Sequence, residues 1–89
     1  MSKIQQAFDM IEALLQGESD PLQFSCDMED FLYDNFSIME KENAEVNDIL
    51  QNKIPDLCSE GEPGFDPTHM IQGIRAEYEK AKAVLNGQN

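Results

Sequence analysis

The sequence predicts an all-α fold: a small bundle of four amphipathic helices, or five if a short turn begun by Pro55 is counted. Apolar residues recur at helical spacing in four segments, and glycine, proline or asparagine stands between these segments. No alternating strand pattern and no Asn-Gly hairpin between apolar runs competes with this interpretation. The 89 residues are expected to form a single domain, residues 1–89, with neighbouring helices roughly antiparallel because the connections are short.

The first helix is expected to begin after Ser2 and to end at Gly17. A serine hydroxyl can accept a hydrogen bond from an unpaired amide of the first turn, and a glycine readily takes the left-handed conformation that ends a helix. The residues expected to face the core are Ile4, Ala7, Phe8, Ile11, Leu14 and Leu15.

The central helix is expected to carry both the most regular apolar face and the most acidic face of the chain. Two starts are consistent with its sequence, Asp20 followed by Pro21 and, alternatively, Ser25. The helix is expected to run to Met39. Its buried stripe would be Phe24, Met28, Phe31, Leu32, Asn35, Phe36 and Met39. Its exposed face would be Asp27, Glu29, Asp30, Tyr33, Asp34 and Ser37.

The third helix is expected to begin at Ala44 behind Asn43, a good N-cap. Apolar residues keep helical spacing across Pro55, but proline has no N–H to donate and its ring crowds the preceding turn. The helix is therefore expected to end near Asn52 or Lys53, with a further short turn after Pro55.

A loop over residues 59–64 and a fourth helix complete the expected fold. Asp66 as N-cap, Pro67 as first helical residue and Phe65 packed against Met70 would start the helix, which would end near Asn86. The apolar stripe of this helix would be Met70, Ile71, Ile74, Tyr78, Ala81 and Leu85.

The negative charge is confined to the middle of the chain. Residues 18–66 hold fourteen acidic residues against Lys41 and Lys53, and this excess equals the whole net charge of −12, because the two ends balance. Such a field repels nucleic acid and anionic membranes and attracts a basic partner toward one side of the molecule.

Catalytic and cofactor motifs are not found in the sequence, so we expect neither an enzyme nor a cofactor. His69 has no partner pattern, and no phosphate-binding glycine motif or calcium loop is present. Cys26, Cys58 and His69 lack the paired spacing of a zinc site, and two cysteines are expected to be free thiols. Without an apolar span or signal-like N-terminus, the chain is expected in the cytoplasm.

Several short motifs together resemble small helical bacterial immunity proteins of contact-dependent growth inhibition and related polymorphic toxin systems. The motifs are Asp20-Pro-Leu-x-Phe-Ser-x-Asp-x-x-Asp-Phe-Leu, Glu42-Asn-x-Glu-Val-x-x-Ile-Leu, Ile54-Pro-Asp-Leu-Cys58, Glu62-Pro-Gly64 and Glu77-Tyr-Glu. The resemblance implies a protein that binds and neutralises a cognate toxin domain, often a nuclease.

The expected partner is therefore a basic toxin domain, bound through Asp27, Glu29, Asp30, Tyr33, Asp34 and Ser37. An alternative is an acidic regulator or nucleic-acid mimic that blocks a basic DNA- or RNA-binding protein. A third, an acyl carrier protein, is similar in size and acidity, but the Asp-Ser-Leu attachment motif is missing. No direct nucleic-acid contact is expected.

Overall fold

A computed structural model describes residues 2–58 and 67–87 and shows five helices, which confirms the predicted all-α class. The helices are α1 (Lys3–Leu15), α2 (Pro21–Asp34), α3 (Phe36–Glu42), α4 (Ala44–Cys58) and α5 (Thr68–Leu85). Within the described ranges no residue belongs to a strand. None of these helices combines the length and the apolar character needed to cross a membrane.

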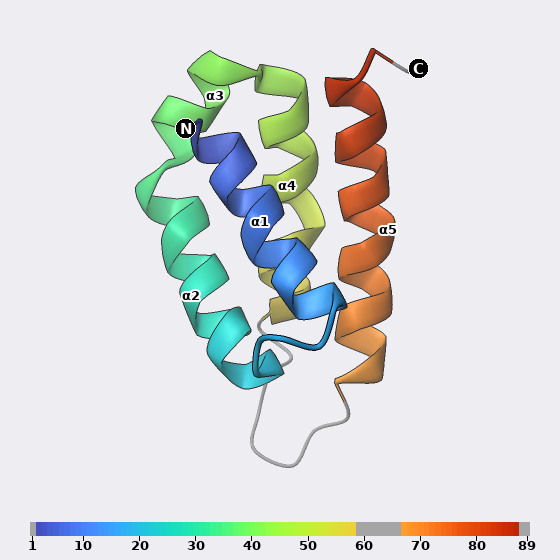
Figure 1. Cartoon of the computed structure of the whole chain (residues 1–89). Coiled ribbons are helices and arrows are strands. Elements are labelled where there is room, and N and C mark those ends of the chain that lie inside the picture. The colour runs from blue at the N-terminus through green and yellow to red at the C-terminus, as the bar shows by residue number, and fades with distance from the viewer. Residues whose placement is uncertain (1, 59–66, 88–89) are drawn as a thin grey trace.

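The helices pack as two antiparallel pairs joined at one end by α3 (Figure 1). In one pair α1 runs against α2, and in the other α4 runs against α5, which is the most extensive helix contact of the fold. The short α3 connects the end of α2 to the start of α4 and also packs against α1. Both described ends of the chain lie near the α3 end of the bundle.

The core draws side chains from all five helices. Its fully buried members include Ile11 from α1, Met28 from α2, Met39 from α3, Leu50 from α4 and Ile74 from α5. Of the six residues predicted to line α1, five are buried and Leu15 is partly buried. Three methionines have no exposed surface: Met28, Met39 and Met70.

Local capping signals set three of the helix starts. The backbone N–H of Gln5 donates to Ser2 Oγ at 3.0 Å, and that of Val46 donates to Asn43 Oδ1 at 3.1 Å. Asp20 accepts from the N–H of Gln23 at 3.0 Å, so α2 begins at the Asp20 cap and not at the alternative start, Ser25. These bonds satisfy amides that have no partner within the helix.

Gly17 ends α1, as predicted, with a left-handed backbone at φ 78°. The N–H of Gly17 donates to the carbonyl of Leu14 at 3.1 Å, and that of Glu18 donates to the carbonyl of Ala13 at 2.8 Å. This is the Schellman arrangement, which pairs carbonyls that the last helical turn leaves free. It reverses the chain tightly enough for Asp20 to start α2 alongside α1.

The prediction of one continuous helix to Met39 was wrong, because the chain breaks at Asn35. Asn35 has φ −112° and ψ 13°, and both its backbone N–H and its Nδ2 donate to the carbonyl of Phe31, at 3.0 and 2.9 Å. Gln51 Nε2, on α4, donates to the carbonyl of Leu32 at 2.9 Å. Side-chain donors thus pair with the carbonyls at the end of α2. Beyond the break, Phe36, which was expected in the core, is 43% exposed.

The prediction that the third helix ends before Pro55 was also wrong. α4 continues to Cys58 with Pro55 inside it. The continuation buries Ile54 and Cys58, which have 0% and 2% of their surface exposed. Burial of these two side chains offsets the cost of a proline in a helix interior, about 3 kcal/mol.

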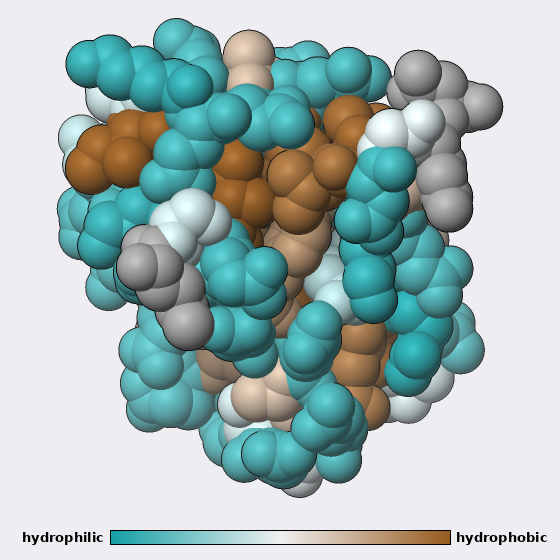
Figure 2. All heavy atoms as spheres, turned by 45° about the horizontal axis from the view of Figure 1, so that its top comes forward, coloured by the Kyte–Doolittle hydropathy of each residue, from teal (hydrophilic) through white to brown (hydrophobic). Residues whose placement is uncertain are grey.

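The loop 59–64, Phe65 and Asp66, which belong to the start predicted for the last helix, lie outside the described residues. Pro67, predicted as the first helical residue, is instead the N-cap of α5, which begins at Thr68. The helix ends at Leu85 and is followed by Gly87 at φ 78°, as predicted. Leu85 is 42% exposed, so its assignment to the buried stripe was wrong. Leu85 is the last residue of α5. Figure 2, in which the α3 end of the bundle is turned forward, shows hydrophobic side chains that reach the surface among hydrophilic ones.

Tyr78 joins α5 to α1 through two contacts, with Glu12 and Phe8, and it also contacts Lys82 on its own helix. Its hydroxyl donates to a carboxylate oxygen of Glu12, its ring meets that of Phe8 edge-on at 5.2 Å, and Lys82 Nζ lies 5.6 Å from the ring centre. Burial, followed by the bond to Glu12, raises the pKa of Tyr78 to about 12. The phenol therefore stays protonated and remains a donor through the physiological range.

Glu42, the last residue of α3, holds the first turn of α1. Its carboxylate accepts from the N–H of Lys3 at 2.9 Å and from the N–H of Ile4 at 3.0 Å. These backbone hydrogen bonds, with that of Ile4 first, lower the pKa of Glu42 from 4.5. The bonds also place a negative charge at the positive end of the α1 dipole.

Replacing Glu42 by glutamine is therefore expected to lower the free energy of unfolding by about 1 kcal/mol at pH 7, because one neutral oxygen replaces two charged ones. The folded-state pKa lies below the unfolded one, so the contribution is present above pH 4.5 and is lost as the pH falls through the folded pKa. Urea unfolding at pH 7 and pH 3 measures this, with Glu40→Gln as the control. An equal loss at both pH values would contradict it.

Candidate functional site

The predicted partner-binding residues are all exposed. Asp27, Glu29, Asp30, Tyr33 and Asp34 lie on α2, and Ser37 lies on α3. Among the described residues, Tyr33 is the most exposed of the large apolar side chains, with 85% of its surface accessible. The 3.6-residue period of α2 turns the five side chains on that helix away from Met28 and Leu32, which are buried.

Part of this face borders a groove between α2 and α4, which we call the α2–α4 groove. Its volume is about 380 Å³, and its lining residues are Glu29, Asp30, Leu32, Tyr33, Gln51 and Pro55. The sequence interpretation missed Gln51 and Pro55. They are four residues apart on α4 and so share one face of that helix, but only the packing of α2 on α4 brings them beside Tyr33.

An amide network fixes the position of Gln51 in this groove. Gln51 Nε2 donates to the carbonyl of Leu32 at 2.9 Å and to Asn47 Oδ1 at 3.3 Å, and Asn47 is 2% exposed. These bonds tie the last turn of α2 to the middle of α4. The groove is therefore held by paired polar groups and does not depend on side-chain packing alone.

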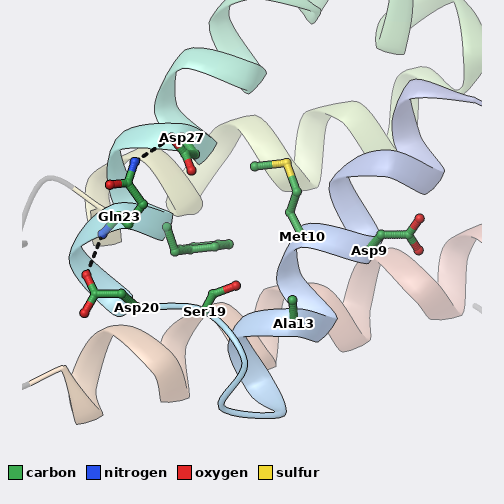
Figure 3. Close-up of a pocket in the computed structure, with 8 residues that line it drawn as sticks. Asp9, Met10, Ala13, Ser19, Asp20, Gln23 and Asp27 are labelled. Atoms are coloured by element: carbon green, nitrogen blue, oxygen red, sulfur yellow. Dashed lines mark hydrogen bonds between the residues drawn. The ribbon is translucent and has the colours of Figure 1, made fainter.

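A second depression lies between α1 and α2, and we call it the α1–α2 hollow (Figure 3). Its volume is about 430 Å³, and its lining residues are Asp9, Met10, Ala13, Ser19, Asp20, Gln23, Phe24 and Asp27. Asp27 Oδ1 accepts from Gln23 Nε2 at 3.0 Å. Asp27 therefore faces this hollow, on the other flank of α2 from the α2–α4 groove.

The structure thus divides the predicted set into three parts. Glu29, Asp30 and Tyr33 line the α2–α4 groove, and Asp27 lines the α1–α2 hollow. Asp34 and Ser37 are exposed but line neither. The break at Asn35 separates Ser37 from the rest, because it ends the helix that carries them.

The cysteines are free thiols, as predicted, and they differ in environment. Cys26 is exposed on α2, whereas Cys58 is buried at the end of α4. Burial first, and then the nearby charge of Glu29 and proximity to Cys26, raise the pKa of Cys58 to about 12. Cys58 is therefore a neutral thiol in the core. Because only the thiolate is a good nucleophile or metal ligand, Cys58 is not suited to either role.

Metal ligation finds no support among residues 2–58 and 67–87. No three His, Cys, Asp or Glu side chains in these ranges gather closely enough to hold an ion. His69 is exposed near the start of α5. The carboxylates of α2 are exposed.

The arrangement provides recognition chemistry on one side of the bundle. It offers a rigid aromatic ring, several carboxylates and an ordered amide edge. Aromatic anchors with carboxylates beside them suit a partner that presents arginine or lysine. Comparison of the chain with protein-family models, with curated proteins and with solved structures finds no match.

Proposed function

We propose that this chain is an immunity protein that binds and neutralises a cognate nuclease toxin domain, an RNase or tRNase, in the cytoplasm of a bacterium. One observation carries the proposal: Tyr33 is 85% exposed between Glu29 and Asp30, at the edge of the α2–α4 groove. An exposed aromatic ring flanked by carboxylates favours an interface with a basic protein over the alternative of a merely solvated helix face.

The chemistry of nucleases supports this choice of partner. A nuclease must hold phosphate and therefore lines its substrate site with lysine and arginine. An acidic protein with a net charge of −12 is attracted to such a surface before contact and associates quickly. Fast capture suits an inhibitor that must act before the toxin cleaves its substrate. The role is stoichiometric inhibition and needs no catalytic group.

The alternative, a nucleic-acid mimic that blocks a basic DNA- or RNA-binding protein, uses the same charge in a different way. A mimic depends on the spacing of many carboxylates and binds several basic proteins. An immunity protein depends on specific contacts, of which Tyr33 is the prime candidate, and binds one toxin. Breadth of binding therefore separates the two functions.

The test is affinity capture from producing cells, with the protein as bait and washes at low and high salt. The wild type is expected to retain one basic nuclease-like domain at near equal stoichiometry and to inhibit its RNA cleavage after purification. Tyr33→Ala combined with Asp30→Lys is expected to weaken binding at least about 30-fold, which corresponds to the loss of one hot spot.

Glu79→Lys is the control for this test, because it makes the same charge change as Asp30→Lys at an exposed position on α5, away from α2. Equal loss of binding in the control and in the double variant would show that only overall charge matters. Unchanged affinity in the double variant would show that the assigned face is wrong. Retention of several unrelated nucleic-acid-binding proteins that all elute in high salt would favour the mimic.

A further inference from the structure

The α1–α2 hollow combines an apolar floor with a negative rim. Met10 and Ala13 from α1 and Phe24 from α2 form its apolar floor, and the polar part of its lining is Asp9, Ser19, Asp20, Gln23 and Asp27. Figure 3 shows Met10 extending from α1 toward α2, with Asp27 and Asp20 on opposite sides of Gln23 along α2. A depression of about 430 Å³ is large enough for an amino-acid side chain.

Hydrogen bonds orient the three carboxylates that line the hollow, through one oxygen each. Asp9 Oδ1 accepts from Gln5 Nε2, Asp27 Oδ1 accepts from Gln23 Nε2, and Asp20 Oδ2 accepts from the backbone N–H of Gln23, each at 3.0 Å. Asp27 Oδ2 and Asp20 Oδ1 remain to accept from another donor. Within the described part of the chain, no lysine or arginine forms an ion pair with either carboxylate.

The occupant that fits this lining is a cation with an apolar stem. A purely apolar group would take water from the carboxylate rim without replacing its hydrogen bonds. A bare metal ion is not favoured either, because the carboxylates that line the hollow do not gather closely enough to hold one. An arginine side chain fits both the apolar floor and the carboxylate rim. Its methylenes cover the floor, and its planar guanidinium is weakly hydrated and bonds readily to carboxylates.

We propose that the α1–α2 hollow is a second binding site, a socket for one arginine side chain presented by a protein partner. With the α2–α4 groove on its other flank, α2 would then be engaged from both sides. The inference rests on the proposed function only in supposing that a basic protein meets α2. It can be tested without that protein, so the two proposals can fail separately.

The test is a nuclear magnetic resonance titration of the full chain at low salt, with n-butylguanidinium as the probe of an arginine side chain. The probe is expected to shift the Met10 methyl signal and the Gln23 and Asp27 amide signals saturably. Guanidinium chloride lacks the stem and n-butanol lacks the charge, so each is expected to need at least about threefold higher concentration. Equal responses to guanidinium and n-butylguanidinium would overturn the socket and indicate counterion binding only.

Matched variants locate the response. Asp27→Asn removes one rim charge but keeps an oxygen for Gln23, and it is expected to weaken probe binding about fivefold. Glu79→Gln removes the same charge on α5, outside the hollow, and is expected to change it less than twofold. An equal effect of the two variants, or no shift of the Met10 methyl signal with the wild type, would overturn the proposal.

Discussion

Replacing Ile54 by alanine is expected to lower the free energy of unfolding by about 3 kcal/mol, a large part of the stability of a domain this small. Ile54 has no exposed surface and lies in the core beside Pro55. Truncation removes its buried methyl and methylene groups and leaves a cavity where α4 packs against the rest of the bundle. Urea unfolding followed by circular dichroism measures the loss.

Ile49→Ala is the matched control, since Ile49 lies on the same helix but is only partly buried. Its loss is expected to be clearly smaller than that of Ile54→Ala. Equal losses would mean that residues beyond Lys53 do not pack as the continuous α4 requires. The comparison thus tests the passage of the helix through Pro55.

Replacing Pro55 by alanine is expected to raise the free energy of unfolding by about 1–2 kcal/mol. Alanine restores an N–H that can donate to the carbonyl of Gln51, and it removes the proline ring from the helix interior. Together these two changes stabilise the helix by about 3 kcal/mol. A more flexible unfolded chain cancels about 1 kcal/mol of that gain. The same variant changes the lining of the α2–α4 groove, so it is expected to weaken capture of the partner while it stabilises the fold.

Pro21→Ala is the control, because Pro21 is the first residue of α2, where a missing N–H has no cost. It is expected to bring no gain in stability. A gain from Pro21→Ala that equals the gain from Pro55→Ala would contradict the helix-interior explanation. Thermal and urea unfolding of the two variants under identical conditions measure the difference.

The parts of the fold that were predictable from sequence are those set by neighbouring residues. Ser2, Asp20 and Asn43 cap their helices through bonds that span three residues, and Gly17 ends α1 through its own backbone conformation. Such signals depend on a few adjacent side chains, so the sequence alone contains them. The helical period likewise predicted that Tyr33 would be exposed.

The errors arose where a distant residue decides the local conformation. The end of α2 depends on Gln51, nineteen residues away, which bonds to the Leu32 carbonyl. The continuation of α4 through Pro55 depends on burial of Ile54 in a core that the whole chain builds. Asparagine in the apolar stripe was the available signal for the break, since Asn35 is a poor helix former that competes for backbone bonds.

The candidate site shows the same division. Periodicity alone placed Glu29, Asp30 and Tyr33 on an exposed face. The groove needs Gln51 and Pro55 from another helix, and the separate position of Asp27 needs α1. Both depend on which helices become neighbours, and helical spacing does not contain that information.

The attachment of α1 has a consequence for synthesis on the ribosome. α1 is translated before the other four helices, yet the carboxylate that holds its first turn belongs to Glu42, and the phenol that bonds to Glu12 belongs to Tyr78. α1 can therefore dock fully only after Tyr78, on α5, has been translated. Until then the nascent chain has no complete core to cover the apolar face of α1, which includes Phe8 and Ile11.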